Sequence, residues 1–215
     1  MGMSLRLTRE AIEIALEEDK PIFIWGDPGA GKSSIIRQIV KDAGVELRDI
    51  RLSQIESIDL RGLPSLKDDK TVWNIPSFMP SDMESCGVIF LDEANDGDPS
   101  TQAACYQLVL ERRIGDYVLP PGWRIIAAGN PNTNRITEAL ANRFTHVHCE
   151  PTIQDWSSWA LKAGIHMDVI GFLVSQPTLL LSMPTDQDEY AFPTPRAWET
   201  TSGYHTRHRN RGACR

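Results

Sequence analysis

The sequence predicts an α/β fold, in which helices flank a central parallel sheet and a small helical part follows. Three short apolar runs have the length of buried strands, and segments with helical periodicity separate them. These runs are 22–25, 87–91 and 123–129. They lack polar alternation, which is typical of strands covered on both faces. The second and third runs end in polar residues, at the edge where open parallel sheets bind ligands.

The composition is that of an ordinary globular chain. Its 215 residues, 41% hydrophobic and 24% charged, suffice for one substantial domain with a small appendage. The net charge of −7 argues against a generally basic protein, so nucleic acid is not an expected partner. No apolar run approaches the ~18–20 residues that span a bilayer, and no signal-peptide core begins the chain. Four widely spaced cysteines are typical of reduced thiols. We expect a soluble, cytoplasmic protein without membrane contact.

The first strand leads into a phosphate-binding pattern. Residues 26–33, GDPGAGKS, fit the motif G-x-x-x-x-G-K-[ST], and a helical pattern with a stop at Gly44 follows. The glycines let backbone N–H groups converge on a phosphate, and the helix directs its positive end there. Lys32 would contact the β- and γ-phosphates, and Ser33 would bind Mg²⁺. A chance glycine-rich turn is the alternative, which the flanking strand and helix disfavour. The predicted nucleotide-binding residues are Gly26, Asp27, Pro28, Gly29, Ala30, Gly31, Lys32, Ser33 and Ser34.

Two further elements are predicted before the second buried run. A helix near the N-terminus is expected to begin at Thr8, and a second strand is expected over 45–52. Residues 53–80 show no clear helix or strand periodicity, and this segment is long for a plain loop inside a compact domain. This segment is either a solvated insertion with a small hairpin around Asp68 and Asp69, or a functional segment.

The second buried run ends in two carboxylates, Asp92 and Glu93. In a protein with a phosphate-binding loop, Asp92 would be the carboxylate at the magnesium site and Glu93 would polarise the attacking water. A charged strand end, which is common on any surface, is the alternative. The position of the pair after the loop favours the functional interpretation.

Four more elements are predicted between residues 98 and 150. They are a helix from Asp98 to about Glu111, a hairpin near Gly115, a short helix from Thr137 to Ala141 and a strand over 145–150. His146 and His148 share one face of that strand. With no third ligand nearby, a solvated strand face is favoured over a metal site.

The C-terminal part has a different character. Helices are predicted from Thr152 to Gly164, over 168–176 and from Pro195 onward. Residues 201–215 are basic and lack acids, so the third helix is expected to stop about one turn after its start. The segment is then either a basic disordered tail or an aberrant end that replaces the rest of a helical lid. The predicted division is a core over 1–150, a partial lid over 151–200 and a tail over 201–215.

With these elements placed, the chain resembles a AAA+ ATPase of the MoxR-like kind, of the dynein-related (AAA_5) type, over roughly residues 8–200. The resemblance rests on GDPGAGKS at 26–33, VIFLDEAN at 88–95, QAACYQLVLERRIGDYVLP at 102–120, IIAAGNP at 125–131, ALANRF at 139–144 and PTPRAWE at 193–199. It implies a P-loop NTPase (AAA+) fold with a small C-terminal helical lid. The chain departs from the family at this lid, which is expected to be incomplete because several helices after Arg196 are missing.

The resemblance also implies an activity, the Mg²⁺-dependent hydrolysis of ATP. Glu93, Asn130 and Arg143 would be its catalytic residues, and Ser33 and Asp92 would bind the metal. Asn130 would be the sensor 1 residue that holds the attacking water. Arg143 would be the arginine finger offered to the ATP of a neighbouring subunit. Arg196 would be the sensor 2 residue that touches the nucleotide from the lid.

Proteins of this kind act as chaperone-like motors that remodel protein partners. The resemblance implies a homo-oligomer, a hexameric ring, often paired with a von Willebrand A-domain protein. The segment 61–73 and the hairpin 112–123 would face a substrate or partner. A nucleotide-gated interaction module with little turnover is the alternative, because the lid looks truncated. A small-molecule phosphotransferase ranks behind both, since it gives no role to Asn130 and Arg143.

Overall fold

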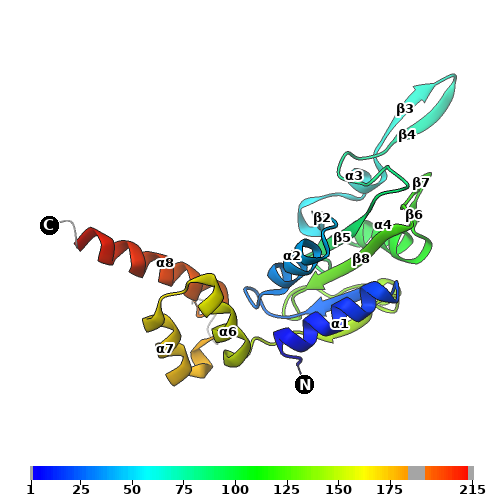
Figure 1. Ribbon diagram of the computed structural model, residues 1–215. Coiled ribbons are helices and arrows are strands. Elements are labelled where there is room, and N and C mark those ends of the chain that lie inside the picture. The colour runs from blue at the N-terminus through cyan, green and yellow to red at the C-terminus, as the bar shows by residue number, and fades with distance from the viewer. Residues whose placement is uncertain (1, 184–191, 213–215) are drawn as a thin grey trace.

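A five-stranded sheet lies at the centre of the computed structural model, which describes residues 2–183 and 192–212 (Figure 1). All four strand pairings are parallel. The strand order across the sheet is β2 (Glu46–Arg51), β5 (Cys86–Asp92), β8 (Gly122–Gly129), β1 (Ile22–Trp25) and β9 (Thr145–His148). The predicted α/β fold with a central parallel sheet is confirmed.

Apolar side chains of the central strands point to both faces of the sheet. In β5, Ile89 and Leu91 join one buried cluster, whereas Val88 and Phe90 join another. Since successive strand residues point to opposite faces, the two clusters lie on opposite sides. The helices that cover the sheet are α1 (Leu5–Glu17), α2 (Lys32–Ala43), α4 (Pro99–Glu111) and α5 (Glu138–Ala141). This two-sided burial is why the strands carry continuous apolar runs.

The start of α1 differs from the prediction. The helix begins at Leu5 with Ser4 as its N-cap, whose side chain accepts a hydrogen bond from the Leu7 N–H. Thr8 is fully buried inside the helix. Both residue types serve as caps, so the pattern alone did not decide between them. A backbone contact places the start of the helix at Leu5. The Met3 N–H donates to the His148 carbonyl (2.6 Å), which fixes the position where the chain turns into the helix.

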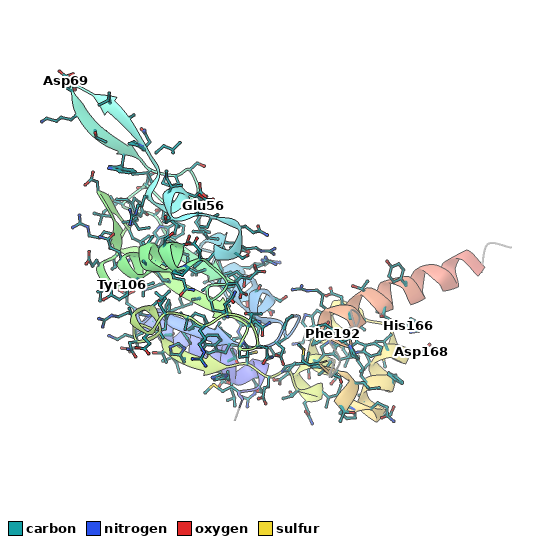
Figure 2. All side chains as sticks on the ribbon, turned by 180° about the vertical axis from the view of Figure 1, so that it is seen from behind. Glu56, Asp69, Tyr106, His166, Asp168 and Phe192 are labelled. Carbon is teal, nitrogen blue, oxygen red and sulfur yellow. The ribbon has the colours of Figure 1, made fainter. Side chains whose placement is uncertain are left out.

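The segment 53–80 contains the predicted hairpin. Its elements are η1 (Leu52–Gln54), α3 (Ser57–Arg61), β3 (Leu63–Lys67) and β4 (Lys70–Asn74). The hairpin turns at Asp68 and Asp69, whose φ angles of 50° and 56° lie in the left-handed region. Every residue of β3 and β4 is exposed. The hairpin projects away from the sheet, with Asp69 at its tip (Figures 1 and 2).

The helix α4 and the hairpin after it are as predicted. Asp98 caps α4 by accepting hydrogen bonds from the Ser100 and Thr101 N–H groups, and Pro99 occupies the first turn. A short hairpin of β6 (Arg113–Ile114) and β7 (Tyr117–Val118) then leads into β8.

The C-terminal helices have their own buried cluster, which includes Trp156, Ala160 and Leu173. They are α6 (Ile153–Ala163), α7 (Met167–Ser175), η2 (Pro177–Leu179) and α8 (Pro195–Gly212). The predicted end of the last helix near residue 200 is wrong, because α8 continues to Gly212 and includes most of the supposed tail. A lack of apolar residues does not by itself end a helix. No proline follows Pro195, and arginine favours helix formation. Residues 213–215 lie outside the described part.

Two smaller predictions concern cysteines and membranes. Cys105 and Cys149 are buried free thiols, whereas Cys86 is an exposed one; Cys214 lies outside the described residues. Burial raises the pKa of Cys105 to about 12, so it stays protonated. Within the described residues, no helix has both the length and the apolar character to cross a membrane.

Candidate active site

The glycine-rich loop joins the end of β1 to the start of α2. Gly29 and Gly31 adopt φ angles of 77° and 100°, which a side chain would disfavour. A Cβ atom on Gly29 would also lie 2.9 Å from Thr194, just before α8. No side chain caps α2, which starts directly after Gly31. The N–H groups of its first turn therefore remain available to an anion.

Lys32 is the first residue of α2, and its side chain reaches back to this loop. Its ammonium donates to the carbonyls of Gly26 (2.5 Å) and Asp27 (3.0 Å). Burial lowers the pKa of Lys32, and the positive charge of Arg196 acts in the same direction. A phosphate in the loop would supply the negative charge that the two carbonyls lack.

Ser33 and Asp92 meet at the expected magnesium site. The Ser33 hydroxyl donates to Asp92 Oδ2 (3.0 Å), and the Glu93 N–H donates to Oδ1 (3.0 Å). Asp92 is only 8% exposed, and this burial raises its pKa despite the two hydrogen bonds. A hydroxyl and one carboxylate fit Mg²⁺, which is usually held by one or two carboxylates together with substrate phosphates and water. Among the described residues, no group of three or more His, Cys, Asp or Glu side chains could hold a metal alone.

Glu93 adopts an uncommon backbone conformation, with φ at 52°. Its carboxylate accepts a hydrogen bond from the hydroxyl of Ser53, which lies in η1 directly after the edge strand β2. A non-glycine residue in the left-handed region is held there by its surroundings and is often functional. No sequence pattern indicated Ser53, because it is forty positions away from Glu93.

Asn95, fully buried, fixes the loop that carries Asn130. Its amide donates to the carbonyls of Asn130 (2.8 Å) and Asn134 (2.7 Å), and its oxygen accepts from the Asn130 N–H (3.1 Å). A Cβ atom on Gly129 would lie 2.2 Å from that oxygen, so only glycine fits there. Asn132 then donates to the Asp27 carboxylate (2.8 Å), which connects this loop to the phosphate-binding loop. Asn95 and Asn132 were not among the predicted site residues.

The two predicted arginines lie in different places. Arg196 shares a cavity of about 730 Å³ with Gly29, Gly31 and Ser34, which brings it to the side of the phosphate-binding loop. Arg143 is exposed beyond the end of α5. It makes no hydrogen bond or ion pair with residues 26–34, Asp92 or Glu93 in the described part of the chain.

Asp92→Asn is expected to raise the midpoint of thermal unfolding at pH 7, without nucleotide or Mg²⁺, by about 2–4 °C. The raised pKa means that the folded chain binds a proton more tightly than the unfolded chain, so the charged carboxylate costs stability at neutral pH. An amide keeps the hydrogen bonds to Ser33 and Glu93 without the charge. The gain should shrink as the pH falls through the raised pKa, because the wild-type carboxyl also becomes neutral.

Scanning calorimetry from about pH 4 to about pH 8 measures this gain. The exposed turn residue Asp116, changed to asparagine, is the matched control and should leave the midpoint nearly unchanged. A gain in Asp92→Asn that does not vary with pH would contradict the assigned cause.

Known proteins resemble this chain in sequence and in fold. The family model for an AAA domain of the dynein-related subfamily matches residues 21–144. Midasin of Giardia intestinalis is 27% identical over 160 residues, which cover 68% of this chain but only 3% of Midasin. NtrX from Brucella abortus in complex with ATP is similar in structure, with a TM-score of 0.56 and 18% identity over 92% of this chain and 47% of that one.

A RuvB variant from Thermotoga maritima is similar in structure, with a TM-score of 0.52 and 14% identity. The match covers 76% of this chain and 51% of the RuvB chain. The chain thus spans about half the length of these solved proteins, and the structural likeness concerns the fold. The family match is the stronger finding, because it covers more than half of the chain and includes the phosphate-binding loop, both carboxylates and Arg143. This protein belongs to the dynein-related subfamily of AAA domains.

Proposed function

We propose that the protein binds ATP at the loop 26–34 and hydrolyses it in a Mg²⁺-dependent reaction. The observation that carries this proposal is the contact between Ser33 and Asp92. Two segments that are 59 positions apart bring a hydroxyl and a buried carboxylate together beside Lys32. A glycine-rich loop alone would account for phosphate binding, whereas this pair adds the oxygen ligands that a nucleotide-bound Mg²⁺ needs.

Each residue has a role that its position supports. The loop N–H groups and Lys32 would hold the β- and γ-phosphates, and Ser33 with Asp92 would hold Mg²⁺, which neutralises charge on the phosphates. Glu93, oriented by Ser53, would polarise the attacking water. Asn130 would help to place that water, from a loop that Asn95 keeps rigid. Arg196 would contact the phosphates from α8.

We further propose that Arg143 acts on the nucleotide of a neighbouring subunit. Among the described residues it makes no hydrogen bond or ion pair with its own phosphate-binding loop, and an exposed arginine can serve an adjacent copy. A ring of identical chains supplies such a contact at every interface. This arrangement fits the proposal of a hexameric, MoxR-like remodeller of protein partners that works with a von Willebrand A-domain protein. A cytoplasmic location remains part of this proposal, on the ground of the unpaired cysteines.

One observation favours a second function, a nucleotide-gated interaction module with little turnover. The hairpin β3–β4 projects from the body (Figure 1). Leu66, which pairs with Thr71 close to the turn of the hairpin, is 82% exposed. Such a segment can hold a partner whether or not ATP is hydrolysed. The two functions differ in whether ATP is consumed.

Turnover measured over a range of protein concentrations tests the proposal. With Mg²⁺, ATP hydrolysis per chain should rise with concentration as subunits meet, and light scattering should show assembly in the same range. A strict monomer with and without ATP and Mg²⁺ would contradict the role of Arg143. Tight ATP binding without turnover, in a protein that does assemble, would favour the interaction module.

A further inference from the structure

The guanidinium of Arg143 rests on a tyrosine ring. Its Cζ atom lies 5.7 Å from the centre of the Tyr106 ring, and one N–H donates to the Tyr106 hydroxyl at 3.4 Å. Six other arginines, namely Arg6, Arg9, Arg37, Arg48, Arg112 and Arg124, pair with carboxylates. Arg143 has no such partner among the described residues. A guanidinium has five N–H donors, so most of those on Arg143 remain free for an anion.

Tyr106 provides a rigid support for this arginine. It belongs to α4, whose neighbouring residues Cys105 and Leu108 are fully buried, and its own ring is partly buried against the same cluster. Figure 2 shows Tyr106 on the body of the molecule, away from the projecting hairpin. A cation held over an aromatic face loses conformational freedom before it meets its ligand.

His146 holds the backbone that leads to Arg143. The Trp25 Nε1–H donates to His146 Nδ1 (2.8 Å), and His146 Nε2 lies 2.8 Å from the Ala141 carbonyl. An indole nitrogen can only donate, so Nδ1 is the acceptor and the imidazole proton is on Nε2, which donates to Ala141. Ala141 ends α5, two positions before Arg143, and Trp25 ends β1, directly before the phosphate-binding loop. The histidine therefore ties the arginine segment to the strand that supports the loop.

We propose that Tyr106 and His146 are positioning residues for Arg143. Tyr106 orders the guanidinium and His146 fixes its backbone, so that the arginine is preformed for a nucleotide phosphate on a neighbouring copy. Neither residue touches the nucleotide. The inference rests on the proposed function, because it gives both residues a role in a step that Arg143 performs.

Tyr106→Leu is expected to lower kcat for ATP about two- to fivefold, the typical value of an exposed cation–π contact, with an unchanged KM. Tyr106→Phe keeps the ring and loses only a long hydrogen bond, so it should remain within about twofold of wild type. The decisive comparison is Tyr106→Leu in an Arg143→Ala background, where it should cause no further loss. An equal loss in that background would show a structural role and overturn the proposal, as would a rise in kcat.

His146→Leu, which removes both hydrogen bonds, should lower kcat about two- to tenfold. His146→Gln offers an acceptor to Trp25 and a donor to Ala141, and should restore most of the rate. If Arg143→Ala lowers kcat but the Tyr106 and His146 variants do not, the positioning role is overturned and the proposed function stands. If Arg143→Ala itself leaves kcat unchanged, the proposed role of Arg143 and the positioning role of Tyr106 and His146 are both overturned, whereas the proposed hydrolysis of ATP is not.

Discussion

Glu93→Gln is expected to lower the turnover of ATP by about 10²–10⁴-fold and to change the dissociation constant of ATP by less than about twofold. The amide has the shape of the carboxylate and still accepts the Ser53 hydrogen bond, so the backbone geometry at Glu93 should persist. It cannot take up a proton from water or polarise it as a carboxylate does. Since the carboxylate acts on water and not on ATP, binding is retained while the chemical step is lost.

Phosphate release and equilibrium binding of a fluorescent ATP analogue measure the two quantities separately. Glu84→Gln is a suitable control, because Glu84 is an exposed carboxylate just before β5, the strand that Glu93 follows. This substitution should leave turnover unchanged. If Glu93→Gln turns over ATP at the wild-type rate, Glu93 is not the catalytic carboxylate. Loss of ATP binding together with turnover would instead indicate that Glu93 maintains the loop structure.

Local features of the sequence predicted most of the fold. Strands buried on both faces must be apolar without alternation, so β1, β5 and β8 stood out. Loop and cap chemistry is also local, which is why Asp98 and Gly164 marked helix ends that the structure contains. The end of α8 was predicted wrongly because a lack of apolar residues was taken as a helix stop, although no proline interrupts the segment.

The site was less predictable, because its supports are contacts between distant segments. Ser53 bonds Glu93, and Asn95 bonds the loop around Asn130, yet neither pair has a spacing that a sequence pattern can recognise. A buried asparagine is costly unless its amide is fully bonded, and that bonding appears only when the chain is folded. The contact between Arg143 and Tyr106 also joins distant segments, so the sequence alone did not indicate it.

Arg143→Ala is expected to lower kcat by about 10³-fold or more while the KM for ATP stays within about twofold. An arginine that approaches from a neighbouring subunit neutralises charge in the transition state, so its loss appears in the rate and not in binding. Arg143→Lys should recover only a small part of the rate, since a lysine keeps the charge but not the planar fork of donors.

Mixing two inactive variants distinguishes an arginine that acts between subunits from one that acts within its own. The Glu93→Gln chain keeps Arg143, and the Arg143→Ala chain keeps Glu93, so some interfaces of a mixed assembly contain one complete site. The mixture should therefore turn over ATP faster than the two variants do separately. A chain with both substitutions, mixed with Arg143→Ala, is the matched control and should give no gain. If the first mixture also gives none, although light scattering shows that mixed assemblies form, Arg143 does not complete the site of a neighbour, because only an arginine that crosses the interface can rescue a subunit that lacks its own.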